Sequence, residues 1–232
     1  MTNDKLSKRL QLVGEFVPND ASLLDIGSDH AYLPIALTQM GKIKHAIAGE
    51  VVQGPYNSAK HNVLSFSLEN EITVRLANGL QAFDPKSDDV DTITICGMGG
   101  HLIADILGAD PEKLTDISTL ILQPNNGERT LRQWLQDHQF KISHETIMSE
   151  NDKIYEIIVA QPCQSSYQLS KDELVFGPIL MTEKSIIFKH KWESELKANQ
   201  AILAKIPETS TDKRSEFEAR IAKIKEVLNA SK

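Results

Sequence analysis

A glycine flanked by acidic residues follows the first apolar segment of the chain. Asp25, Gly27 and Asp29 lie in the sequence Leu-Leu-Asp-Ile-Gly-Ser-Asp-His-Ala-Tyr, residues 23–32. Glycine lets the backbone turn sharply and approach a ligand closely, while the Asp25 carboxylate can receive a cationic group. The full GxGxxG fingerprint of dinucleotide sites is missing. The pattern therefore favours S-adenosylmethionine, a positively charged cofactor without phosphate, over a plain turn without a ligand.

Two further segment ends offer groups for the same cofactor. Glu50 ends the second apolar segment, 23 residues after Gly27, close to the offset of roughly 20 at which an acidic residue binds a ribose diol. A Glu that opens a helix is also a favourable partner of the helix dipole. Asn78 ends the third segment and is predicted to read the adenine of the cofactor, although Asn-Gly is equally a turn signal.

The later segment ends are predicted to bind the methyl acceptor. Gly97 lies in Cys-Gly-Met-Gly-Gly, residues 96–100, and would let backbone approach the cofactor, although such glycines also make tight turns. Arg129 and Arg132 are three residues apart and would hold phosphate or form a solvated helix face. None of the seven His has metal-ligand spacing to another His or Cys, so no metal is predicted. The residues predicted to line the acceptor side are Tyr32, Met98, Gln123, Asn125, Asn126 and Arg129.

An alternation of strands and helices must position these residues. Short segments that are apolar on both faces predict five buried parallel strands, at 22–27, 45–50, 72–78, 92–98 and 119–124. Helical patterns follow a first helix over 6–17, at 31–40, 53–68, 101–107 and 128–138. Residues 141–150 and 153–161 flank Asn-Asp, a turn signal for an antiparallel pair. The chain is predicted to form an α/β fold with a seven-stranded, mostly parallel sheet, whose carboxyl ends bind ligands.

The C-terminal region has a different pattern. Apolar positions recur at helical spacing from Trp192 to Ile206 and again from Phe217 to Leu228, with a break over 207–212. This predicts an antiparallel helical hairpin, a short coiled coil with Asn199 on its seam. We divide the chain into a cofactor-binding domain, residues 1–163, and a linker with the helical hairpin, residues 164–232.

Charge is distributed unevenly between these two parts. Residues 1–183 carry 14 Lys and Arg against 25 Asp and Glu, whereas residues 184–232 carry 11 against 7. A basic appendage on an acidic body is either an RNA contact surface or a solvated Lys-rich helix face. No apolar run approaches the roughly 18 residues of a membrane span, and the two cysteines are far apart. We expect a cytoplasmic protein without a membrane partner, with a monomer slightly favoured.

Several of these segments resemble one family. Asp-Ile-Gly-Ser-Asp-His-Ala-Tyr-Leu-Pro at 25–34, Gly-Pro at 54–55, Gly-Met-Gly-Gly at 97–100 and Leu-Gln-Pro-Asn at 122–125 are similar to the TrmK family of bacterial methyltransferases, which modify N1 of adenine 22 in tRNA. The resemblance extends over nearly the whole chain. It implies an S-adenosylmethionine-dependent, Rossmann-like class I methyltransferase, a helical tail that helps to hold tRNA, and Asp29 at the catalytic centre.

The reaction itself sets modest chemical demands. N1 of adenine is neutral with an in-plane lone pair, so the enzyme must supply positioning and accommodate the positive charge that reaches the base. Asp29 could accept a hydrogen bond from the adenine N6 amine. The nucleotide must also leave its stack. Two other functions stay open: a nicotinamide-dependent Rossmann oxidoreductase, which the incomplete glycine fingerprint disfavours, and a non-catalytic RNA-binding adapter.

Overall fold

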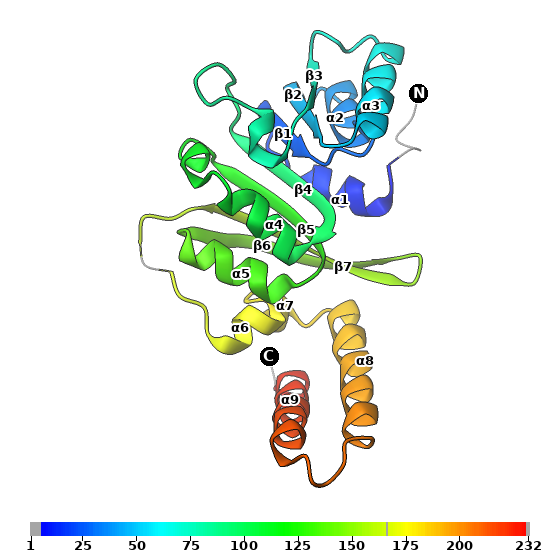
Figure 1. The fold of residues 1–232 in the computed structure, drawn as a ribbon, viewed down its shortest axis with the longest axis vertical. Helices are drawn as coiled ribbons and strands as arrows, with labels where there is room; N and C mark the ends of the chain where they lie inside the picture. The colour runs from blue at the N-terminus through cyan, green and yellow to red at the C-terminus, as the bar shows by residue number, and fades with distance from the viewer. Residues whose placement is uncertain (1–5, 166, 231–232) are drawn as a thin grey trace.

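A computed structural model describes residues 6–165 and 167–230. It contains one seven-stranded sheet with helices on both faces and a pair of long helices that projects from one edge (Figure 1). The strands are β1 (Ala21–Ile26), β2 (Ile43–Glu50), β3 (Ile72–Leu76), β4 (Thr92–Gly99), β5 (Thr119–Asn126), β6 (Phe140–Glu150) and β7 (Lys153–Pro162). The helices of the sheet region are α1 (Lys8–Phe16), α2 (Tyr32–Gln39), α3 (Gln53–Ser65), α4 (Gly100–Gly108) and α5 (Glu128–Asp137), with short 3₁₀ helices η2 (Gly79–Ala82) and η3 (Pro111–Leu114).

The strand order is β3-β2-β1-β4-β5-β7-β6. Strands β1 to β5 run parallel, and β7 pairs antiparallel with both β5 and β6. The order reverses between β1 and β4, the kind of switch point at which open α/β sheets bind ligands. The predicted sheet and its closing hairpin are confirmed.

Both faces of the sheet are covered because successive strand residues point to opposite faces. On one face, Leu24 and Leu120 pack with the apolar sides of α4 and α5. On the other, Leu23 and Ile121 pack with α1, α2 and α3. This two-sided burial explains why β1 and the first halves of β4 and β5 are buried almost throughout. It leaves the carboxyl ends of the strands as the place where polar groups gather.

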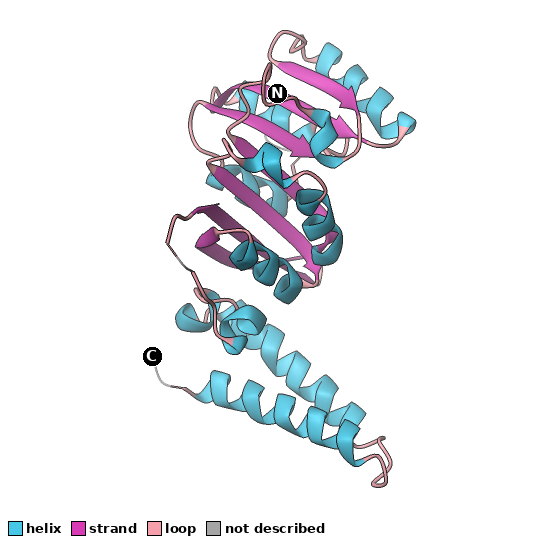
Figure 2. Ribbon diagram, turned by 60° about the vertical axis from the view of Figure 1, so that its left-hand side comes forward, coloured by secondary structure: helices cyan, strands magenta, loops and turns pink. Residues whose placement is uncertain are grey.

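The C-terminal region forms the predicted helical hairpin. Helices α8 (Ile186–Leu203) and α9 (Thr211–Asn229) lie side by side (Figure 2). Two short helices that the sequence analysis missed, α6 (Lys171–Phe176) and α7 (Leu180–Glu183), connect them to the sheet. A third apolar cluster joins Phe176 and Trp192 with Ile147 of β6, so the hairpin is packed onto the sheet edge. No helix in the described part of the chain is long and apolar enough to cross a membrane.

Candidate functional site

A cavity of about 330 Å³ lies at the carboxyl ends of β1 and β4, at the switch point. Six residues predicted from the sequence line it: Asp25, Gly27, Asp29, Gly97, Met98 and Asn125. The remaining lining residues are Arg9, Leu10, Ser28, Leu33, Cys96 and Tyr155. Cofactor-side and acceptor-side residues therefore meet in one place.

Asp25 is held rigidly at the end of β1. Its carboxylate is buried and accepts hydrogen bonds from Ser28 Oγ and Thr94 Oγ1, both at 2.6 Å. The register of β1 against β4 places Thr94 directly beside Asp25. Burial raises the pKa of the Asp25 carboxyl, and the two hydroxyl donors oppose that rise. Asp25 thus fixes the turn that follows it and presents its remaining acceptor capacity to the cavity.

The turn after β1 has an unusual backbone. Gly27 has φ of +67°, and Asp29, His30 and Ala31 follow with φ of +43°, +69° and +60°. Consecutive left-handed residues other than glycine are strained, and such strain is concentrated at functional sites. A Cβ at Gly27 would collide with the methyl group of Met98. Met98, predicted on the acceptor side, therefore also covers the cofactor turn.

Asp29 is free to face a ligand. Its side chain is 82% exposed and lies 3.4 Å from His30 Nε2. Helix α2 begins at Tyr32 with Ala31 as its N-cap, and no side chain caps it. Asp29 therefore does not serve as the cap of this helix.

Glu50 ends β2 beside this turn, with only 6% of the residue exposed. Its Oε1 atom is buried and has no hydrogen-bond partner among the described residues. Burial raises the pKa of the Glu50 carboxyl, while the backbone N–H groups of Asp29 and His30 oppose the rise. A buried acceptor without a partner is rare in folded proteins. The position fits a ligand that brings its own donors, such as a ribose diol.

The β4 and β5 ends are tied together by side-chain amides. The Gly97 N–H donates to Gln123 Oε1 at 3.0 Å, and Asn125 Nδ2 donates to the Gly97 carbonyl at 2.7 Å. Gln123 is fully buried, and its Nε2 donates to the Pro124 carbonyl at 2.8 Å. Gln123 therefore supports the ends of β4 and β5 from behind, whereas Asn125 lines the cavity itself.

The other predicted residues lie outside this cavity. Asn78 is exposed at the end of β3 and does not cap η2. Tyr32 is half-buried, with its ring 5.5 Å from that of His30, and Asn126 is exposed at the end of β5. Arg129 lines a separate cavity of about 640 Å³ between α5 and the helical hairpin.

The structure corrects the sequence-based prediction for Arg132. This residue was expected to hold phosphate or to lie on a solvated helix face, but it is fully buried. Its guanidinium donates to Glu145 at 2.8 Å and to Glu156 at 2.5 Å. Both carboxylates come from strands far along the chain, so helical spacing gave no sign of them. Arg132 has a structural role.

Six of the residues that line the cavity were not predicted as site residues, among them an arginine and a tyrosine. Arg9 comes from α1 and Tyr155 from β7, and the guanidinium lies 5.4 Å from the centre of the Tyr155 ring. Neither belongs to a motif, and only the fold brings them to the strand ends. Local sequence spacing contains no signal that would have found them.

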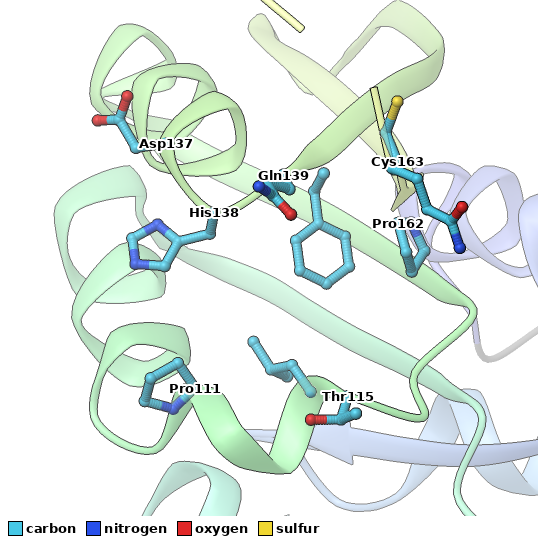
Figure 3. Close-up of a pocket in the computed structure, with 10 residues that line it drawn as sticks. Pro111, Thr115, Asp137, His138, Gln139, Pro162 and Cys163 are labelled. Carbon is cyan, nitrogen blue, oxygen red and sulfur yellow. The ribbon is translucent and has the colours of Figure 1, made fainter. Parts of the chain in front are cut away.

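A different cavity, of about 370 Å³, lies near the amino end of β5, and Figure 3 shows the side chains that line it. It contains His138 and Cys163. His138 Nδ1 lies 2.8 Å from the Trp134 carbonyl, and Cys163 Sγ lies 3.1 Å from Ser165 Oγ. The two groups therefore do not form a nucleophile and base pair, and this cavity offers no catalytic arrangement.

Comparison with known proteins identifies the relatives of the chain. The model of the family TrmK, tRNA (adenine(22)-N(1))-methyltransferase, matches residues 23–226. A tRNA (adenine(22)-N(1))-methyltransferase of Bacillus subtilis is 42% identical over 99% of both chains. A putative tRNA (m1A22) methyltransferase of Streptococcus pneumoniae, solved with S-adenosyl-L-methionine, is 50% identical with a TM-score of 0.89, over 97% of this chain and 100% of that one.

A third relative, TrmK of M. capricolum solved with S-adenosyl-homocysteine, is 35% identical with a TM-score of 0.88, over 97% of this chain and 98% of that one. The resemblance seen in the sequence is confirmed. Because the family model and these relatives cover nearly all of its length, the chain belongs to the TrmK family of tRNA (adenine(22)-N(1))-methyltransferases.

Proposed function

We propose that this chain transfers the methyl group of S-adenosylmethionine to N1 of adenine 22 in tRNA, acting in the cytoplasm. The observation that carries the proposal is the 42% identity to a tRNA (adenine(22)-N(1))-methyltransferase over 99% of the chain. The solved relatives that contain S-adenosylmethionine or its product support the cofactor. They also disfavour the nicotinamide alternative, as does the incomplete glycine fingerprint.

Glu50, Asp25 and Gly27 would hold the cofactor. The partnerless Oε1 of Glu50 would accept the ribose hydroxyls. Asp25 would orient the charged methionine end, and Gly27 would let the backbone lie against it. Gly97 and Asn78 would complete this side from the ends of β4 and β3. When bound, S-adenosylmethionine supplies a methyl group on a sulfonium sulfur, which becomes a neutral thioether as the methyl leaves.

Asp29 is the catalytic residue in this proposal. N1 of adenine uses its own lone pair, so no base has to remove a proton before transfer. Positive charge then develops on the adenine ring, and the Asp29 carboxylate would stabilise it by accepting a hydrogen bond from the N6 amine. Asp29 lies in the strained turn and does not cap α2. Among the described residues, His30 is the one basic side chain that lies within ion-pair distance of it. Four side chains would surround the base, those of Met98, Asn125, Asn126 and Tyr32. Gln123 would support this part of the cavity wall from behind.

The helical hairpin would contact the tRNA backbone, together with Arg129 at its base. We keep the division into residues 1–163 and 164–232 as part of this proposal. Lys197 and Lys213 are exposed on α8 and α9 and form no ion pair among the described residues. Unpaired cations on a projecting element are typical of phosphate contacts.

Mass-spectrometric mapping of nucleosides tests the reaction. The purified chain is incubated with S-adenosylmethionine and a tRNA that carries adenine 22, and the matched control is the same tRNA with guanine at that position. We expect one 1-methyladenine, at position 22, in the first tRNA alone. Methylation at another position would overturn the assigned site, and absence of methylation would favour a non-catalytic RNA-binding adapter.

Paired lysine substitutions test the hairpin. Lys197→Gln with Lys213→Gln should weaken tRNA binding and flatten its salt dependence, since each lost phosphate contact removes about 0.9 or less from the log–log slope. The control is Lys86→Gln with Lys141→Gln, two exposed positions in the sheet region. Equal effects of the two pairs would assign the hairpin a structural role only.

A further inference from the structure

Helix α1 contributes an arginine, Arg9, to the wall of the cavity. The proposed function assigns no role to this residue. Arg9 is the basic residue among those that line the cavity. Asp25 and Asp29 line the same cavity from the turn after β1. The cavity therefore presents negative groups on one element and a positive group on another, an arrangement suited to a ligand portion with both charges.

The backbone that carries Arg9 is fixed before any ligand binds. The Glu150 carboxylate, at the end of β6, accepts hydrogen bonds from the backbone N–H groups of Lys8 and Arg9 at 2.8 and 3.3 Å. Ser7 caps the helix through its Oγ, which accepts from the Leu10 N–H at 3.2 Å. Glu150 thus holds the start of α1 against the β6–β7 hairpin and leaves the Arg9 guanidinium for other partners.

The guanidinium is oriented by neutral groups. It lies over the Tyr155 ring and donates through Nη1 to Gln123 Oε1. A Cβ at Gly97 would lie 3.9 Å from Nη1 and 4.0 Å from Nη2, so the guanidinium lies beside the turn at the end of β4. An arginine has five N–H donors in a planar fork that matches a carboxylate. Within the described part of the chain, Nη1 is the one guanidinium nitrogen of Arg9 that donates a hydrogen bond.

No carboxylate of the described residues forms an ion pair with Arg9. The nearby Asp25 already accepts from Ser28 and Thr94. The Cys96 thiol does not serve as an anion either, because burial raises its pKa far above neutral pH. A half-buried cation without a counter-ion, held by neutral groups, is a receptor for an anion that a ligand supplies.

We infer that Arg9 binds the carboxylate of the methionine portion of S-adenosylmethionine, while the ammonium group of that portion faces the Asp25 side. The inference rests on the proposed function, since it assigns a further contact to the same cofactor. It gives Arg9 a binding and positioning role: by fixing the methionine end, Arg9 fixes the sulfonium relative to the acceptor wall, to which it is joined through Gln123.

A cycle of two proteins and two ligands tests the inference. Calorimetry measures the binding of S-adenosylmethionine and of its decarboxylated analogue, which lacks only the carboxylate, to the parent chain and to Arg9→Met. The parent should bind the analogue about tenfold more weakly, and Arg9→Met should lose about tenfold for S-adenosylmethionine and nothing for the analogue. Lys8→Met, an exposed neighbour outside the cavity, is the matched control and should change neither affinity.

Two results would overturn the inference. Equal losses for both ligands would mean that Arg9 only supports the wall through Gln123. Unchanged cofactor binding with a higher KM for tRNA would mean that Arg9 contacts a nucleotide phosphate instead. If the parent chain binds neither ligand, the proposed function fails, and the inference fails with it. The measurements on the parent chain alone distinguish this outcome from a failure of the inference. Arg9→Lys, which keeps the charge but not the fork, should recover only part of the lost affinity.

Discussion

Two groups of charged side chains in this molecule differ in whether an opposite charge lies beside them. At the junction of the sheet with the helical hairpin, Arg132 joins Glu145 and Glu156, and Lys191 of α8 joins Glu156 and Glu128 at 2.7 and 2.9 Å. Glu145 also accepts from the Ile179 N–H at 2.9 Å. Every charge in this network has an opposite charge beside it.

The two buried carboxylates at the switch point, Asp25 and Glu50, form no ion pair with any described residue. Asp25 accepts hydrogen bonds from two neutral hydroxyls, and Glu50 keeps one buried oxygen without a partner in the described part of the chain. Burial raises the pKa of both carboxyls. The contrast separates charges that hold the fold together, which are satisfied within the protein, from charges that a ligand must complete.

The largest effect is expected from breaking the paired network. Arg132→Met leaves the buried Glu145 without a cation and Glu156 with Lys191 alone, and it should lower the free energy of unfolding by about 3–5 kcal/mol. Urea unfolding at pH 7 measures it. The control is Arg220→Met, which removes a partly exposed pair with Glu195 and should cost no more than about 1 kcal/mol. Similar losses in the two variants would contradict a special role for the buried network.

At the switch point, Asp29→Asn should change rate rather than stability. Asparagine tolerates the left-handed backbone at this position and removes only the charge. Turnover should fall about a hundredfold, while the melting temperature and the dissociation constants for S-adenosylmethionine and tRNA stay near the parent values. Single-turnover kinetics and calorimetry measure these quantities. Near-normal turnover would show that the Asp29 charge takes no part in methyl transfer.

The smallest expected effect is that of substituting Glu50, and it tests the comparison most directly. Glu50→Gln should weaken S-adenosylmethionine binding about tenfold yet stabilise the ligand-free protein at neutral pH. The pKa of Glu50 is raised in the folded state, so the folded protein binds this proton more tightly than the unfolded chain. Ionised Glu50 therefore lowers the free energy of unfolding at pH values above its raised pKa. This destabilisation disappears as the pH falls toward 4.5, the ordinary pKa of a Glu carboxyl.

Thermal unfolding across pH, with and without cofactor, measures both effects of Glu50→Gln. The gain in melting temperature should be greatest on the alkaline side and fade in acid. Saturating cofactor should stabilise the parent more than the variant. A variant that is less stable than the parent at every pH would mean that Glu50 supports the fold through the turn at Asp29 and His30.

The sequence predicted elements better than it predicted partners. Two-sided apolar segments sufficed for β1 to β5 and helical spacing for α8 and α9, because burial imposes these patterns locally. For β6 and β7, the turn signal between them sufficed. Helix α6 was missed although Ser170 and Glu173 form a capping box whose spacing is visible in the sequence. Arg132 and Arg9 could not be interpreted in the same way, since their partners lie on strands brought near only by the sheet.

The ion pairs of Lys191 limit how chimeric proteins can be made from this chain. Lys191 belongs to the helical hairpin, but both of its carboxylate partners, on α5 and β7, belong to the sheet region. A chimera that grafts the hairpin of one relative onto the sheet of another must therefore transplant all three residues together. A hairpin without a cation at this position would leave Glu128 without an ion-pair partner among the described residues and Glu156 with Arg132 alone, so the hairpin and the sheet have to be engineered as one piece.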